Sequence, residues 1–110
     1  MSQVVIQQQA GPLPIRQSFM WPSSEAIIVA VSGSAFVTKP NTVMAVQVMV
    51  DDKVLGTVQV LAGVAGSHLA LPAGFFAIQR QISQAAITLS VGSDTTATDL
   101  NDHFTVALIF

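Results

Sequence analysis

The sequence predicts an all-β fold, an antiparallel β-sandwich or jelly roll of about eight or nine short strands. β-branched residues recur along the whole chain, whereas helix signals are scarce. Short apolar or alternating segments are separated by turn residues, which is typical of sandwiches and barrels. A chain of 110 residues is long enough for one core, so we expect a single domain over residues 1–110.

The first third of the chain favours short strands separated by turns. The two prolines that follow the first apolar segment cannot donate to a strand ladder, so they end it. The wholly apolar run that follows Glu25 predicts a strand buried on both faces, with a bulge at Gly33. The expected strands are Val4–Ile6, Ile15–Phe19 at a sheet edge, Glu25–Val31 and Ala35–Thr38.

A β-hairpin is the clearest element. Valines alternate with other residues from Met44 to Val50, and again from Val54 to Leu61, with the polar turn Asp51-Asp52-Lys53 between them. Period 2 on both sides of a turn indicates an antiparallel pair. The second face of the hairpin carries Met49, Leu55 and Leu61, which favours a subunit contact or a second packed layer there.

Further strands are expected in the second half of the chain. Ala85–Val91 alternates and Phe104–Phe110 is apolar, so both read as strands. His68–Leu71 is a short strand. Phe75–Ile82 is read as a strand, although glutamine, arginine and alanine leave a helical turn open across residues 75–84.

The composition predicts self-association. Hydrophobic residues make up 51% of the chain and charged residues only 9%, against about 25% charged residues in a typical domain. A small domain exposes much of its surface, so apolar faces are buried between subunits or covered by Gln, Ser and Thr. We expect both, and therefore a homo-oligomer.

Several partners and compartments are excluded or disfavoured. The four cations are scattered and the net charge is −2, which argues against nucleic acid. The absence of cysteine excludes disulfides and thiolate metal sites. The longest apolar run, Ala26–Val31, is too short for a membrane span. No signal peptide is recognised, so we expect cytoplasmic synthesis, with non-classical export or association with a virion left open.

An acidic loop, Gly92–Asp102, is the candidate site. Its eleven residues exceed the usual hairpin length, and long loops are often functional. Ca²⁺ takes six to eight oxygen ligands from carboxylates, amides, backbone carbonyls and water. The predicted metal ligands are Asp94, Asp99, Asn101 and Asp102. The simpler alternative is that Asp, Asn and Thr form solvated turns that bind nothing.

The closing segment resembles that of the small calcium-dependent, fucose- and mannose-binding bacterial lectins. Val91-Gly92-Ser93 and Asp99-Leu100-Asn101-Asp102 match that family's pattern, and the hairpin Val46–Asp52 is also similar. The resemblance implies a β-sandwich that forms dimers or tetramers, with calcium held by Asp99, Asn101 and Asp102 and completed by sugar hydroxyls. Ser93 and Ala97 stand where the family has acids, so it implies one calcium at most.

Aromatic and histidine residues supply further candidates. Trp21, the only tryptophan, is either a stacking platform for sugar or an anchor at the edge of the core. His68 and His103 either meet as metal ligands or as a proton pair, or are structural. No phosphate-binding lysine loop and no Gly-x-Ser-x-Gly motif is present, so we do not expect an enzyme.

The leading hypothesis from the sequence is a non-catalytic, lectin-like carbohydrate-binding module. It acts as a homo-oligomer and is assisted by calcium in the 94–102 loop, with Asp99, Asn101, Asp102 and Trp21 as ligand-binding residues. The alternative is a structural or assembly protein, such as a virion, tail or shell component, with no small-molecule ligand.

Overall fold

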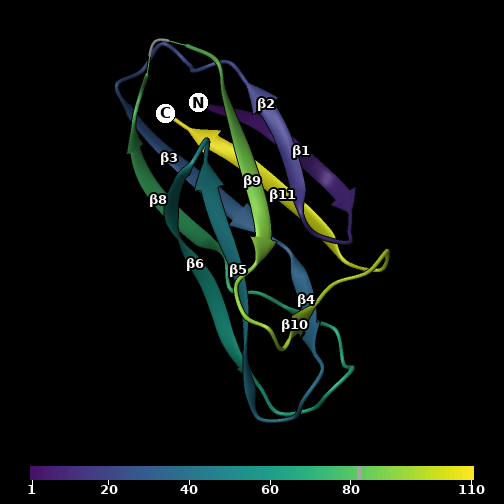
Figure 1. Cartoon of the computed structure of the whole chain (residues 1–110). Coiled ribbons are helices and arrows are strands. Elements are labelled where there is room, and N and C mark those ends of the chain that lie inside the picture. Colours follow the sequence, from purple (N-terminus) through teal and green to yellow (C-terminus); the bar gives the residue numbers. More distant parts are fainter. Residues whose placement is uncertain (82) are drawn as a thin grey trace.

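Every regular element in the part of the chain described by this computed structural model, residues 1–81 and 83–110, is a β-strand (Figure 1). The strands are β1 (Ser2–Ala10), β2 (Ile15–Phe19), β3 (Ala26–Ser32), β4 (Ser34–Val37), β5 (Thr42–Val50), β6 (Lys53–Ala62), β7 (Leu69–Ala70), β8 (Gly74–Gln79), β9 (Ala85–Val91), β10 (Thr96–Ala97) and β11 (His103–Ile109). Within these residues no helix is long and apolar enough to cross a membrane.

Two four-stranded antiparallel sheets form the body of the molecule. Their orders are β1-β11-β3-β8 and β2-β9-β5-β6, and a smaller sheet has the order β10-β4-β7. The two large sheets enclose one hydrophobic core, in which Val29, Val106 and Leu108 of the first sheet meet Val48 and Leu89 of the second. The predicted β-sandwich is therefore confirmed.

The structure has more strands than the sequence predicted. The strand that the sequence did not predict is β10, whose two residues are too few to show any periodicity. The predicted short strand at His68–Leu71 is present as β7 over Leu69–Ala70. The first strand spans Ser2–Ala10 rather than Val4–Ile6. The segment at residues 75–84 is a strand over Gly74–Gln79, which excludes a helix there; residue 82 lies outside the described part.

The prediction that the third strand is buried on both faces is wrong. Ile27, Val29 and Val31 are buried, but Ile28 between them is 41% exposed. Within one copy of the chain, only the inner face of this strand is covered, and its outer face is apolar but exposed. The hairpin shows a similar pattern, with Val46 and Val48 in the core and Leu61 exposed.

Gly33 is the point where the chain leaves one sheet for another. β3 pairs with β11 and β8, whereas β4, which begins at Ser34, pairs with β10 and β7. A Cβ atom at Gly33 would collide with the ring of Phe104, which is almost fully buried. The predicted bulge is thus a change of sheet that only glycine permits beside this ring.

Phe76 closes the sandwich on the side of β6 and β8, which are the outer strands of different large sheets. Its ring lies against Gly56 of β6 and Gly74 at the start of β8. A Cβ atom built on Gly56 would stand 2.5 Å from Phe76 Cε1. The two glycines therefore leave the space that this ring occupies.

Candidate functional site

The first half of the acidic loop is fixed to the sheets. β10 lies within the loop and pairs with β4, so the loop is not the unstructured connection that its length suggested. The Thr96 hydroxyl oxygen is buried and accepts a 2.9 Å hydrogen bond from the backbone N–H of Ala45. The Gly92 N–H donates to the Ala45 carbonyl at 2.8 Å. These contacts determine where the second half of the loop begins.

Asp102 is the centre of the site and is fully buried. Its Oδ1 accepts hydrogen bonds from Ser34 Oγ at 2.6 Å and from His68 Nδ1 at 2.8 Å. Its Oδ2 accepts one from the Asp99 backbone N–H at 2.9 Å. A buried carboxylate is tolerated when its oxygens are hydrogen-bonded and a cation is near. One side chain therefore joins β4, the segment before β7 and the acidic loop.

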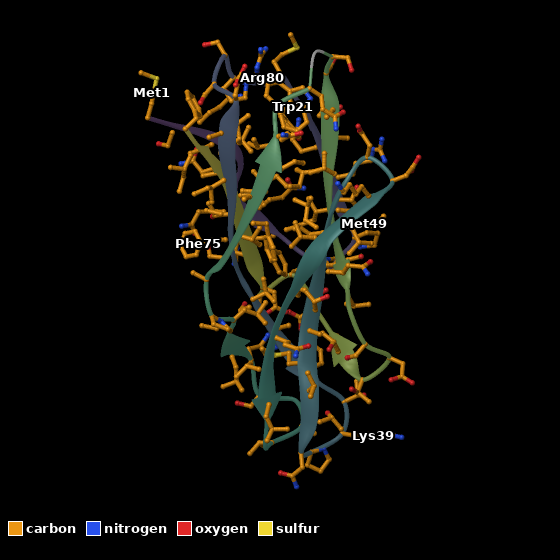
Figure 2. All side chains as sticks on the ribbon, turned by 90° about the vertical axis from the view of Figure 1, so that its left-hand side faces the viewer. Met1, Trp21, Lys39, Met49, Phe75 and Arg80 are labelled. Atoms are coloured by element: carbon orange, nitrogen blue, oxygen red, sulfur yellow. The ribbon has the colours of Figure 1, made fainter. Side chains whose placement is uncertain are left out.

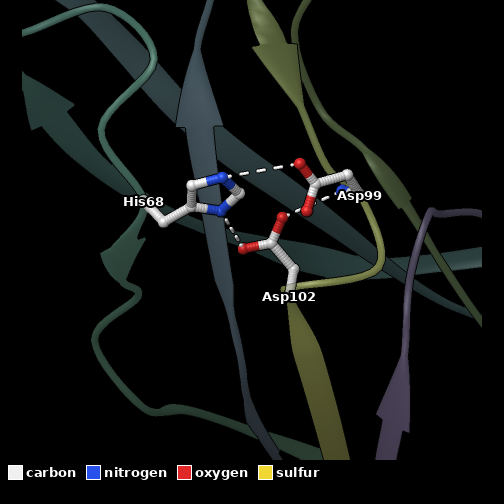
Figure 3. Close-up of side chains that lie close together, drawn as sticks. All are labelled: His68, Asp99 and Asp102. Carbon is white, nitrogen blue, oxygen red and sulfur yellow. Dashed lines mark hydrogen bonds and ion pairs between the residues drawn. The ribbon is translucent and has the colours of Figure 1, made fainter.

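His68 is held beside this carboxylate by the small sheet. It precedes β7, whose two residues pair with β4, and its ring lies 4.6 Å from the ring of Phe36, centroid to centroid. Nδ1 donates to Asp102, and the other ring nitrogen, Nε2, lies 3.5 Å from Asp99 Oδ2. Figure 3 shows the two carboxylates side by side, with one ring nitrogen of His68 directed at each.

The electrostatics of the pair favour the ionised forms. The hydrogen bond with Asp102 raises the pKa of His68 above its ordinary 6.5, and the charges of Asp102 and Asp99 add to this against the effect of burial. Burial alone would raise the pKa of Asp102. Its hydrogen bonds with His68, Ser34 and the Asp99 backbone outweigh burial, so the pKa falls below the ordinary 3.8.

Of the four predicted metal ligands, the structure brings Asp99 and Asp102 together with His68, leaves Asn101 beside Asp99, and places Asp94 outside the group. Ligand atoms of Asp99, Asp102 and His68 all lie within 4.8 Å of one another. Asn101 is exposed and its backbone N–H donates to Asp99 Oδ1 at 2.8 Å. Asp94 is exposed and does not belong to this group of three. We call His68, Asp99 and Asp102 the acid–histidine cluster.

Trp21 lies elsewhere. Figure 2 shows it at the same end of the molecule as Arg80 and at the opposite end from Lys39, whereas the cluster lies around β4 and β7. Its ring packs edge-on against Phe19, with centroids 5.0 Å apart, and against the core. Its position matches the edge-of-core anchor weighed from the sequence. A role in sugar binding stays a prediction, separate from the cluster.

His68 and His103 do not form a pair in the cluster. His103 begins β11 directly after Asp102, and it is exposed while its neighbours Asp102 and Phe104 are buried. Successive strand residues point to opposite faces, so His103 faces away from the carboxylate that binds His68.

Sequence reasoning missed three residues that position the site. It weighed His68 as a metal ligand only together with His103, not with the carboxylates, and it did not consider Ser34. It also missed Gly11, whose N–H donates to the Asp102 carbonyl at 2.7 Å. A Cβ atom at Gly11 would stand 2.7 Å from the Asp99 carbonyl oxygen, so only glycine fits. No spacing rule links these positions, because the fold alone brings them together.

The cluster has the donor set of a divalent cation site. Carboxylate oxygens suit calcium, and an imidazole nitrogen suits transition metals such as zinc. Asp102 orients His68 through Nδ1 and leaves Nε2 facing Asp99, an arrangement common where histidine binds metal. Nε2 faces a carboxylate rather than a hydroxyl, so the described geometry favours binding of a cation over activation of a serine.

Comparison with known proteins identifies the fold. No protein-family model and no curated protein matches the sequence. The structure is similar to the CBM36-1 domain of a multidomain xylanase from the hindgut metagenome of Trinervitermes trinervoides, at 13% identity and a TM-score of 0.55 over 96% of each chain. It is also similar to a carbohydrate-binding module, CBM36, in complex with calcium and xylotriose. That match has 10% identity and a TM-score of 0.50, and covers 100% of this chain and 98% of the other.

These likenesses show a shared fold. Neither neighbour is one of the fucose- and mannose-binding lectins that the closing segment resembles. The coarser resemblance, to small β-sandwich carbohydrate-binding modules, is the one that the neighbours support.

Proposed function

We propose that this chain is a non-catalytic carbohydrate-binding module that binds sugar with the help of a divalent cation, calcium first. The observation that carries the proposal is the acid–histidine cluster on this fold. The neighbouring module of the same fold is in complex with calcium and xylotriose, and this chain places two carboxylates and an imidazole within 4.8 Å.

Asp99 is the residue best placed to contact a ligand. Its side chain is 45% exposed, whereas that of Asp102 is buried. Asp102 already accepts three hydrogen bonds. The main role of its side chain is therefore to position His68 and the backbone of Asp99. Asn101 would add an amide oxygen beside Asp99. A bound cation would supply positive charge that attracts sugar hydroxyls, and those hydroxyls with water would complete its coordination shell.

The cation is tested by thermal unfolding in EDTA, calcium and zinc. A ligand that binds only the folded state stabilises it by about 2.7 kcal/mol at a hundredfold excess over Kd. We expect a rise in Tm for the parent protein and for Asp94→Ala, and none for Asp99→Ala. Asp94 is the matched control because it is an exposed aspartate of the same loop outside the cluster. Equal shifts in all three proteins would rule out the cluster as the cation site.

Sugar binding is tested separately on a glycan array that includes xylo-oligosaccharides, with and without the cation that stabilises the protein. We expect binding that EDTA removes and that Asp99→Ala abolishes. An array with no bound glycan in any cation would contradict the carbohydrate proposal, whether or not a metal binds.

The structural or assembly role remains the second candidate because one observation favours it. The outer face of the sheet β1-β11-β3-β8 carries exposed apolar side chains, among them Phe75 at 64% exposure. Monomeric proteins rarely expose large continuous apolar patches.

A further inference from the structure

The outer face of the sheet β1-β11-β3-β8 is apolar and uncharged across all four strands. Its side chains lie in rows set by the strand register. Ile28 is opposite Ala77 and Ile109, and Ala30 is opposite Phe75 and Ala107. Val4 extends the second row from β1. We call this the outer apolar face, and its members are Val4, Ala26, Ile28, Ala30, Phe75, Ala77, Ala107 and Ile109.

The exposure of this face is substantial. Val4, Ile28 and Ile109 are 52%, 41% and 38% exposed. The alanines between them have short side chains, so the face is nearly flat there. The outward residues that continue the rows, Ser2, Ser32, Gln79 and Thr105, are polar but uncharged. The four strands place no Asp, Glu, Lys or Arg on this face, and Glu25 borders it only at the hollow. The face is therefore better matched to another apolar surface than to nucleic acid or a charged peptide.

A projection and a hollow lie on the same face. Phe75 projects from it (Figure 2). Beside it, a hollow of about 720 Å³ is lined by the outward residues Ala26, Ile28, Ala77, Gln79 and Ile109, together with Glu25, Ile27, Ile78 and Phe110. Phe75 and Ala77 are two residues apart on β8, so the ring and the hollow are neighbours. A surface with both features is complementary to itself.

We propose that two copies of this chain associate through the outer apolar face. A two-fold axis between the facing sheets, midway between Phe75 and the hollow, places the ring of each copy over the hollow of the other. Two-fold dimers use the same patch on both subunits, which requires this self-complementarity. None of the cluster residues belongs to the face.

The size of the face sets the expected affinity. Strands are spaced about 4.8 Å apart and rise about 3.3 Å per residue, so four strands of seven residues cover roughly 450 Å². Two such faces remove on the order of 1,000 Å² from water, near the lower limit for specific interfaces. We therefore expect a reversible dimer with a Kd in the micromolar range rather than a permanent one.

The test is sedimentation velocity over a protein series from about 1 to 500 µM, which brackets a micromolar Kd. We expect a monomer–dimer equilibrium for the parent and a Kd raised at least about tenfold by Phe75→Ser. Leu61→Ser is the matched control, because Leu61 is 67% exposed on the other large sheet, against 64% for Phe75. Its Kd should equal that of the parent.

A second measurement keeps the proposal independent of folding defects. The chain has no cysteine, so Phe75→Cys and Ile28→Cys introduce single thiols on opposite sides of the proposed axis. With equal amounts of the two variants, a short cross-linker should join Phe75→Cys to Ile28→Cys faster than it joins either variant to itself. A parent that stays monomeric over the whole series would overturn the proposal. The proposal would also be wrong if Leu61→Ser dissociated the dimer and Phe75→Ser did not. It would equally be wrong if the protein stayed monomeric and bound neutral lipid vesicles through Phe75.

Discussion

Removal of the Asp102 carboxylate should destabilise the fold even when no metal is present. In Asp102→Ala, the Ser34 hydroxyl and the Asp99 N–H lose their acceptor. Each part-buried donor left without a partner costs about 1 to 3 kcal/mol, so we expect a loss of about 2 to 6 kcal/mol. Total stabilities of domains are about 5 to 15 kcal/mol, so this loss is a large fraction of the whole. His68 can turn toward water, because a third of its side chain is exposed.

The assay is urea unfolding at neutral pH in EDTA. Asp102→Asn keeps an acceptor for Ser34 but turns an amide donor toward the Asp99 N–H, so it should lose about 1 to 3 kcal/mol. Asp94→Ala, an exposed control in the same loop, should stay within about 0.5 kcal/mol of the parent. If Asp102→Ala also stayed within that margin, the idea that this carboxylate holds three segments together would be wrong.

Three further predictions follow from the packing and the ionisation. The His68 contribution to stability is fully present below pH 6.5 and is lost as pH rises through its raised pKa. The Asp102 contribution is present above pH 3.8 and is lost as pH falls through its lowered pKa. Tm should therefore be highest between these limits, and His68→Gln should remove the alkaline decline in a pH series. Gly33→Ala places a methyl group against the Phe104 ring and should cost about 1 to 3 kcal/mol by denaturant unfolding, partly recovered by Phe104→Leu. Ile87→Val, in the centre of the core, should cost about 0.5 to 1.5 kcal/mol in the same assay, and a neutral result would mean that the core is looser than the structure shows.

The sequence predicted the elements whose pattern is local. β9 spans Ala85–Val91, as expected from its alternation, and β5 and β6 flank a turn at Asp51 and Asp52. Period-2 burial and turn chemistry act over a few residues, so they can be read from one sequence. The pairing of β3 with β11 and β8 joins distant segments and was not predictable in this way.

The site was only half predictable for the same reason. Crowding of carboxylates made Asp99 and Asp102 candidates, because like charges close in sequence need a compensating group. The groups that compensate them lie far along the chain. His68 is 34 positions and Ser34 is 68 positions from Asp102, and only the sheet-to-sheet crossing at Gly33 and the pairing of β4 with β7 bring them there.

The ring of Phe76 has a consequence for how the molecule fluctuates. β6 and β8 belong to different sheets and meet through side chains alone, the Phe76 ring between two glycines and Val58 against Gly74. Side-chain packing separates more readily than a ladder of backbone hydrogen bonds, so this seam is where transient opening should begin. In native-state hydrogen–deuterium exchange, the amides of β8 should lose protection before those of β5 and β11, which have a paired strand on either side.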